Sequence, residues 1–268
     1  MTHSWRTATV ESGGETIYYE VTGADHAPAV VLTHGAGGSH AAWFQQVPAL
    51  AAAGYRVVTW DSRGFGRSTF DTGVLGTEAA VADLVAVVDA VGIERAHLVG
   101  QSMGGWWVTA FALAHPDRVR SLTLSNTVGG LWTEALARHF SEFAAAPHAD
   151  DGRLGVHSAL GPSFAARDPA GAFLYQQLNT FHAPPLAAIG RALARTTVEH
   201  AALDALGIRV LVITGSDDAL FPAPLVVDSA SRLAHATIVE IADAGHSPYF
   251  ERPDAYNAAL LEFLGEPS

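Results

Sequence analysis

Hydrophobic and polar positions alternate along this chain with two periods, one of about two residues and one of about 3.6. Residues 6–10 and 15–21 alternate around a Ser-Gly-Gly turn, which predicts a β-hairpin at a sheet edge. Short apolar runs typical of buried strands follow at 29–33, 56–60, 96–99, 119–124, 210–214 and 237–241. Segments with helical spacing lie at 43–53, 77–91, 104–114 and 253–264. This order predicts an α/β fold with a mostly parallel, eight-stranded sheet flanked by helices.

One stretch at the centre of this pattern has the composition of a catalytic turn. Gly100-Gln101-Ser102-Met103-Gly104 joins the run at 96–99 directly to the helical segment at 104–114. So tight a corner brings backbone close to backbone, and small residues at 100 and 104 permit it. The hydroxyl of Ser102 would then stand above the sheet edge, at the positive end of a helix dipole. Ser102 is therefore the candidate nucleophile.

A serine nucleophile needs a base and an orienting acid. Of the thirteen histidines, His246 follows the last strand and precedes the last helix, which places it at the same sheet edge as Ser102. Asp217 and Asp218 follow the run at 210–214, whereas the loop after 119–124 has no acidic residue. We prefer Asp218 as the acid and interpret Asp217 as a turn former. The order Ser102, Asp218, His246 agrees with this architecture.

Residues 130–205 interrupt the alternation of strands and helices. Helical pieces at 132–143, 172–181 and 187–198 are separated by Pro, Gly and charged residues, with no strand-like run among them. The segment is too rich in aromatic residues for a linker, because these side chains need a surface to pack on: Phe140, Phe143, Phe164, Phe173, Tyr175 and Phe181. We expect a helical cap at 130–205, inserted over the active-site face of a core formed by residues 1–129 and 206–268.

The charge and cysteine content narrow the possible partners. A formal net charge of −12 over 268 residues disfavours nucleic acid and anionic membranes as partners. The absence of cysteine excludes disulfides, thiolate catalysis and thiolate-ligated metals. The first residues have no signal-peptide pattern, and no apolar run reaches membrane-spanning length, so we expect a soluble cytoplasmic protein. No cofactor or metal is expected, and the oligomeric state is open.

Further motifs make the chain similar to the α/β-hydrolase fold superfamily over its whole length, and to serine esterases and lactonases with a helical cap in particular. They are His34-Gly35-Ala36-Gly37, Asp61-Ser62-Arg63-Gly64-Phe65-Gly66-Arg67-Ser68, Gly215-Ser216-Asp217-Asp218 and Gly245-His246-Ser247-Pro248. The resemblance implies that Asp218 is the acid and that the backbone N–H groups of Ala36 and Met103 form the oxyanion hole. It also implies structural roles in loops for His34, Asp61, Arg63 and Ser68.

The resemblance and the serine nucleophile together favour hydrolysis of a carboxylic ester or lactone through an acyl-enzyme. An aromatic cap suggests a small to medium, fairly apolar substrate. Gly35, Trp106 and Phe221 are candidates for the pocket, although Trp106 could equally be a core residue. Three alternatives stay open: a C–C bond hydrolase of meta-cleavage-type products, a cofactor-free perhydrolase, and a non-catalytic ligand receptor. The C–C hydrolases that the chain resembles tend to carry Asn before the serine and Trp near the histidine, where this chain has Gln101 and Tyr249-Phe250.

Overall fold

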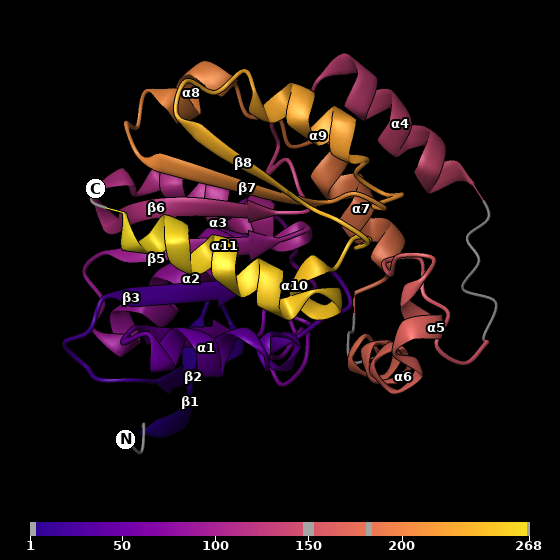
Figure 1. The fold of residues 1–268 in the computed structure, drawn as a ribbon. Helices are drawn as coiled ribbons and strands as arrows, with labels where there is room; N and C mark the ends of the chain where they lie inside the picture. Colours follow the sequence, from indigo (N-terminus) through magenta and orange to yellow (C-terminus); the bar gives the residue numbers. More distant parts are fainter. Residues whose placement is uncertain (1–3, 147–152, 181–183, 267–268) are drawn as a thin grey trace.

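The computed structural model describes residues 4–146, 153–180 and 184–266, and contains the predicted eight-stranded sheet (Figure 1). The strands are β1 (Trp5–Ser12), β2 (Glu15–Thr22), β3 (Ala29–Thr33), β4 (Arg56–Trp60), β5 (Ala96–Gln101), β6 (Val119–Ser125), β7 (Arg209–Gly215) and β8 (Ala236–Ile241). Their spatial order is β1-β2-β4-β3-β5-β6-β7-β8. The β1–β2 hairpin joins β4 in antiparallel fashion, and all further pairs are parallel. The fold class predicted from the sequence is confirmed.

Helices cover both faces of the sheet. They are α1 (Gln46–Ala52), α2 (Thr77–Val91), α3 (Met103–Ala114), α9 (Ala223–Ala230), α10 (Pro248–Glu251) and α11 (Pro253–Gly265), with 3₁₀ turns η1 (His40–Trp43) and η2 (Pro116–Arg118). Figure 1 shows α1 and α11 on the face toward the viewer. The helix predicted at 43–53 corresponds to the shorter α1, and η1, which the Ser39 side chain caps, precedes it. The short helices α9 and α10 were not predicted.

Five helices connect β6 to β7: α4 (Glu134–Ala145), α5 (Phe164–Arg167), α6 (Pro169–Leu178), α7 (Leu186–Ala194) and α8 (His200–Asp204). Helices α4, α6 and α7 match the predicted helical pieces within a few residues, and none of the described residues of this segment forms a strand. Figure 1 shows α4 to α7 gathered at one end of the sheet. Not every aromatic residue here is packed, since Phe173 is 43% exposed. Phe181 lies outside the described residues.

The core consists of two apolar clusters, one on each face of the sheet. In β3, Val31 belongs to the cluster beneath α2 and α3, whereas its neighbours Val30 and Leu32 belong to the cluster beneath α1 and α11. Successive side chains of a strand point to opposite faces, so a continuous apolar run such as 29–33 fills both clusters. This double burial holds the central strands rigidly and fixes the edge at which their following loops meet.

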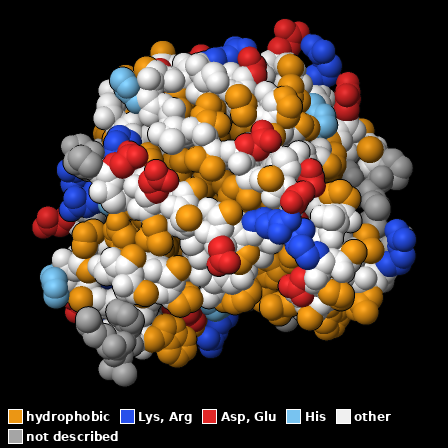
Figure 2. Space-filling model, in the orientation of Figure 1, with side chains coloured by type: hydrophobic (Ala, Val, Ile, Leu, Met, Phe, Trp, Pro, Cys, Tyr) orange, Lys and Arg blue, Asp and Glu red, His pale blue; other side chains and the backbone are white. Residues whose placement is uncertain are grey.

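The surface carries mixed charge. On the face shown in Figure 2, acidic and basic side chains are interspersed among apolar and neutral ones. Among the described helices, none combines the length and apolarity that crossing a bilayer would require.

Candidate active site

Ser102 lies at the sharp corner between β5 and α3. Its backbone has φ 48° and ψ −120°, a conformation that side-chain-bearing residues rarely adopt and that costs roughly 1–3 kcal/mol. A Cβ at Gly100 would lie 2.4 Å from the carbonyl oxygen of Gly104, and one at Gly104 would lie 2.4 Å from that of Thr33. Backbone atoms cannot yield at such distances, so both positions require glycine. Ser102 precedes the first residue of α3 without capping it through its side chain, which leaves the hydroxyl free for chemistry.

The structure brings the candidate base and acid together. Asp218 and His246 follow β7 and β8, and Asp218 Oδ2 lies 2.9 Å from His246 Nδ1. The other carboxylate oxygen, Oδ1, accepts hydrogen bonds of 2.9 Å from the backbone N–H groups of Leu220 and Phe221. Asp217, by contrast, is exposed, and its carboxylate accepts from the hydroxyl of Ser216. Of the two adjacent carboxylates, only Asp218 contacts His246.

The loop of His246 is tied to the corner that carries Ser102. Gln101 Nε2 donates a hydrogen bond of 3.0 Å to the backbone oxygen of His246, so the residue before the serine binds the histidine loop directly. His246 itself is 5% exposed, and its Nε2 has no hydrogen-bond partner among the described residues. An unpartnered buried ring nitrogen costs free energy in the resting protein, and a role in proton transfer is one explanation for its presence. Ser102, Asp218 and His246 thus come from three neighbouring loops at one sheet edge.

The two amides expected to form an oxyanion hole flank this corner. Met103 is the first residue of α3, where N–H groups have no acceptor within the helix. Ala36 belongs to the loop after β3, and its neighbour Gly35 approaches so closely that a Cβ there would lie 3.0 Å from Ser102 Cβ. Within the described residues, neither the Met103 nor the Ala36 N–H donates a hydrogen bond. Neither donor has an acceptor among the described residues, as an oxyanion hole requires.

His34 holds the loop that carries Ala36. The backbone N–H of Ser62 donates to His34 Nε2 at 3.0 Å, so the ring proton sits on Nδ1, which donates to the oxygen of Gly35 at 2.7 Å. Burial lowers the pKa of His34, and the neutral ring matches this pattern of one acceptor and one donor. His34 thus acts as the loop organiser that the sequence suggested.

The other loop residues expected to be structural are also bound within the protein. The buried Asp61 carboxylate accepts from the backbone N–H groups of His40 and Arg67, at 2.6 and 2.8 Å. Ser68 Oγ donates to the backbone oxygen of Asp61 at 2.7 Å. Arg63 forms a two-pronged ion pair with Asp83 of α2. These contacts fix the loop after β4 against its neighbours.

An aromatic cluster lies against His246. Phe221 stacks on the imidazole with ring centres 5.7 Å apart, and Trp106 and Phe140 lie 6.0 and 5.5 Å from Phe221. Trp132 completes the cluster at 5.6 Å from Trp106. Trp106 and Phe221 are each 1% exposed, so both are core residues of this structure as well as neighbours of the site.

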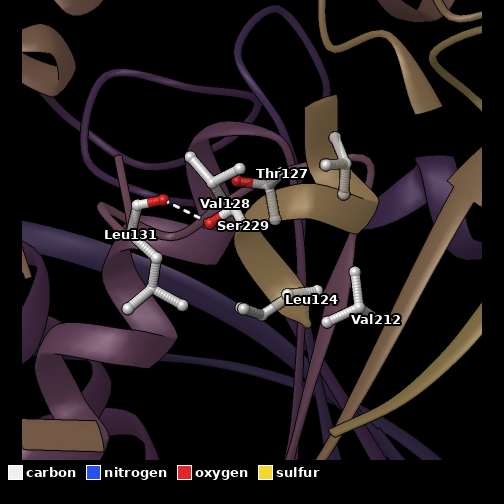
Figure 3. Close-up of a pocket in the computed structure, with 8 residues that line it drawn as sticks. Leu124, Thr127, Val128, Leu131, Val212 and Ser229 are labelled. Atoms are coloured by element: carbon white, nitrogen blue, oxygen red, sulfur yellow. Dashed lines mark hydrogen bonds between the residues drawn. The ribbon is translucent and has the colours of Figure 1, made fainter. Parts of the chain in front are cut away.

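A small cavity lies nearby but is a separate feature. It has a volume of about 10 Å³, room for about one water molecule, between β6, β7 and α9 (Figure 3). Its lining includes Leu124, Thr127, Val212 and Ser229, whose hydroxyl donates to the oxygen of Leu131. None of the candidate catalytic or pocket residues lines it. It is too small for an organic substrate.

Sequence reasoning missed several residues that hold the His246 loop. The buried carboxylate of Glu251 accepts the backbone N–H groups of Gly245 and of Gly161, each at 2.9 Å, and so ties the segment between β6 and β7 to this loop. Burial raises the pKa of Glu251. Tyr175 of α6 lies 2.7 Å from Ser247 Oγ through its hydroxyl. Sequence periodicity could not reveal these contacts, because it reports on single helices and strands and not on which elements meet in space.

A further missed residue is Asn126, directly after β6. Its Nδ2 donates to Asp218 Oδ2 at 2.9 Å and to the oxygen of Gly245 at 3.1 Å. A polar residue following a central strand was the one available signal in the sequence. No cluster of three or more His, Cys, Asp or Glu side chains suited to a metal ion occurs in the described part of the chain.

Comparison with known proteins identifies the family. A family model for the alpha/beta hydrolase fold matches residues 28–253. The chain belongs to the α/β-hydrolase family. It is 33% identical to a protein of Variovorax paradoxus provisionally named carbamate hydrolase RutD, over 94% of this chain and 97% of that one. It is 30% identical to 3-oxoadipate enol-lactonase 1 of Acinetobacter baylyi, over 94% of each chain.

Solved structures of α/β-hydrolases superpose on this chain over nearly its whole length. An esterase from Thermogutta terrifontis superposes with a TM-score of 0.80 at 25% identity, covering 97% of this chain and 98% of the other. The 2-hydroxy-6-oxo-6-phenylhexa-2,4-dienoate hydrolase of Rhodococcus strain RHA1 has a TM-score of 0.75 at 25% identity, covering 99% and 100%. The protein is thus an α/β-hydrolase enzyme, and its relatives act on small molecules.

Proposed function

We propose that this protein is a serine hydrolase that cleaves a carboxylic ester or lactone through an acyl-enzyme formed on Ser102. The observation that carries the proposal is the hydrogen bond of 2.9 Å between Asp218 Oδ2 and His246 Nδ1. This hydrogen bond orients the imidazole ring of His246, whose buried Nε2 has no partner among the described residues. Gln101 binds the backbone of the same loop to the corner that carries Ser102. A base oriented in this way is what a serine nucleophile requires.

The reaction would run in two halves. Ser102 Oγ attacks the carbonyl carbon while His246 Nε2 takes the hydroxyl proton, and Asp218 holds the imidazolium that results. The backbone N–H groups of Met103 and Ala36 stabilise the oxyanion, each donor contributing about 2.7–4 kcal/mol. Expulsion of the alcohol, which receives the proton from His246, leaves Ser102 acylated. Water then attacks the acyl carbon with His246 as base, and release of the acid returns the proton to Ser102.

The segment 130–205 is proposed as a cap over this site, with residues 1–129 and 206–268 as the core. The residue that follows α6 supports this placement: Asn179 lies so near the loop after β3, which carries Ala36, that a Cβ on Gly37 would meet its Oδ1 at 2.9 Å. Gly35, Trp106 and Phe221 are proposed as pocket residues beside the acyl carbon. The rings around Phe221 favour a small to medium, fairly apolar substrate.

The names of the relatives set the range of substrates to test. The relatives are named for hydrolysis of a carbamate, of an enol-lactone and of a dienoate. Carbamates and enol-lactones both react by acyl transfer, which needs a serine nucleophile with its base and acid and two amide donors for the oxyanion. Cleavage of a C–C bond in a dienoate is the second candidate, favoured by the structural similarity to the Rhodococcus enzyme.

The test is a hydrolysis screen of the wild type, Ser102→Ala and Ser62→Ala. Substrates are chromogenic esters of graded chain length, several lactones, an aryl carbamate and a ring-cleavage dienoate. Ser62 is a matched control, because it is buried in a neighbouring loop and its hydroxyl has no hydrogen-bond partner among the described residues. Ester or lactone turnover should disappear in Ser102→Ala and persist in Ser62→Ala, and mass spectrometry should find the trapped acyl group on Ser102.

Other outcomes would redirect the proposal. Undiminished turnover by Ser102→Ala would overturn the nucleophile. Turnover of the dienoate alone would favour the C–C hydrolase, and ester perhydrolysis with hydrogen peroxide exceeding hydrolysis would favour the perhydrolase. If no substrate is turned over but a ligand raises the melting temperature, the protein would be a receptor.

A further inference from the structure

Asn126 occupies a constrained position between the serine corner and the acid loop. It follows the last residue of β6, Ser125, whose backbone oxygen accepts the N–H of Ser102 at 3.0 Å. Its own N–H donates to the oxygen of Ile213 in β7 at 2.8 Å. The backbone has φ +48°, in the left-handed region, and the residue is fully buried. Asparagine, aspartate and glycine tolerate that conformation best.

The side chain of Asn126 joins two of the loops that form the candidate active site. One N–H of its amide group donates to Asp218 Oδ2 and the other to the backbone oxygen of Gly245, the residue before His246. Two donors on one nitrogen are a property of an amide, which aspartate and glycine lack. Only asparagine combines this side chain with ready access to the left-handed backbone. Both the conformation and the chemistry therefore select this residue type.

We propose that Asn126 is a positioning residue for the acid and the base, a role that rests on the proposed serine mechanism. By holding the Asp218 carboxylate and the Gly245 carbonyl from one atom, Asn126 sets the distance between the two loops. Asp218 Oδ2 accepts from Asn126 and from His246 at the same distance of 2.9 Å. Without the amide, Asp218 keeps its backbone donors on Oδ1 but loses the partner that aims Oδ2 at the imidazole.

Two substitutions separate this role from simple packing. Asn126→Asp keeps the shape and the backbone conformation, but it removes both donors and places a carboxylate against Asp218. When protonated, the introduced group regains one O–H donor, so its defect should ease as the pH falls. Asn126→Gly keeps the backbone conformation and removes both hydrogen bonds without adding charge, so its loss should vary little with pH. The titratable groups facing this position are Asp218 and His246, with Glu251 behind Gly245.

The matched control is Thr123→Val. Thr123 belongs to β6, the strand that Asn126 follows, and is 1% exposed, and its hydroxyl has no hydrogen-bond partner among the described residues. The substitution changes a buried side chain of β6 without removing a hydrogen bond. Any effect of disturbing this strand alone should appear in this variant as well.

The experiment measures kcat and KM across pH 5–9 on an ester that the wild type hydrolyses. We expect kcat of Asn126→Asp, relative to wild type at the same pH, to fall at least about tenfold at high pH and to recover in part at low pH. The loss should stay below the roughly 10⁴-fold cost of removing the acid itself. KM should stay within about twofold, because a fully buried residue does not touch substrate. Wild-type kcat in both Asn126 variants, or a loss shared with Thr123→Val, would overturn the proposal.

A measurement without turnover keeps the two proposals distinguishable. The low-field proton resonance of His246 Nδ1–H reports its hydrogen bond to Asp218, and it should shift or broaden in Asn126→Asp and Asn126→Gly. It should be unchanged in Ser102→Ala and Thr123→Val. An unchanged resonance in the Asn126 variants would refute the positioning role even if the serine mechanism holds. If the resonance shifts in the Asn126 variants as expected but the wild type hydrolyses no ester or lactone, only the proposed function is refuted.

Discussion

The buried ion pair between Arg63 and Asp83 offers the sharpest test of what holds the loop after β4. Arg63 Nε lies 2.7 Å from Asp83 Oδ2, and Arg63 Nη2 lies 2.6 Å from Oδ1. The side chains are 4% and 0% exposed. Asp83→Asn removes the carboxylate and leaves a guanidinium in the interior without its counter-charge. Unpairing a buried charge costs roughly 3–5 kcal/mol, so we expect that loss in the free energy of unfolding.

The same helix supplies the control. Asp89 of α2 pairs with Arg118 at 2.7 Å, but its side chain is 56% exposed. Solvent screens such a pair, whose contribution is about 0–1 kcal/mol. Urea unfolding followed by tryptophan fluorescence should therefore separate Asp83→Asn clearly from Asp89→Asn. At about 2–4 °C per kcal/mol, the melting temperature should fall by roughly 6–20 °C in the first variant and by a few degrees at most in the second.

A double variant completes the test. Arg63→Met combined with Asp83→Leu removes both charges, and apolar replacements of a buried pair are often neutral or stabilising. The double variant should be more stable than Asp83→Asn alone. Equal small losses in Asp83→Asn and Asp89→Asn would refute the reasoning, and so would a double variant as unstable as the single one.

Three further predictions follow from the site and its supports. Asp218→Asn should lower kcat by roughly 10⁴-fold while Asp217→Asn leaves it near wild type, and the reverse ranking in steady-state assays would mean that the wrong carboxylate was chosen. Gly104→Ala should destabilise the protein by about 1–3 kcal/mol in urea unfolding, because its Cβ meets backbone, whereas Gly190→Ala meets open space and should stabilise α7. Burial raises the pKa of Glu15, but its hydrogen bonds outweigh this and lower it from 4.5 to about 2. The stability lost in Glu15→Gln should be complete above about pH 4.5 and should vanish toward pH 2 in melting curves, because only the ionised carboxylate makes the favourable contacts.

Much of the fold could be read from local patterns. The run at 29–33 is apolar throughout because β3 is buried on both faces. The alternating hairpin lies at the end of the sheet, where β1 is the mostly exposed edge strand and β2 pairs with both β1 and β4. The central corner was recognisable because Gly100 and Gly104 stand at positions where any Cβ would strike the backbone. A steric requirement of this kind is visible in the sequence because it restricts one position to one residue type.

The segment between β6 and β7 was harder to predict in detail. Helices α4, α6 and α7 have helical spacing of apolar residues, but this spacing does not determine which helix faces pack against the rest of the protein. Phe173 is exposed although aromatic residues tend to be packed. The short helices α9 and α10 were missed because a few residues bounded by proline carry too little periodicity to detect.

The sequence by itself determined the order of strands and helices, the serine corner, and the loops from which an acid and a base could come. These depend on periodicity and on local backbone geometry, which neighbouring residues encode. The tertiary structure places Asp218, the acid that the sequence and the resemblance favoured, against His246. Only the tertiary structure decided that Asn126 and Glu251 hold the loops around them. Those contacts join residues far apart in the chain, and their energy depends on distance and direction in space, which no local pattern records.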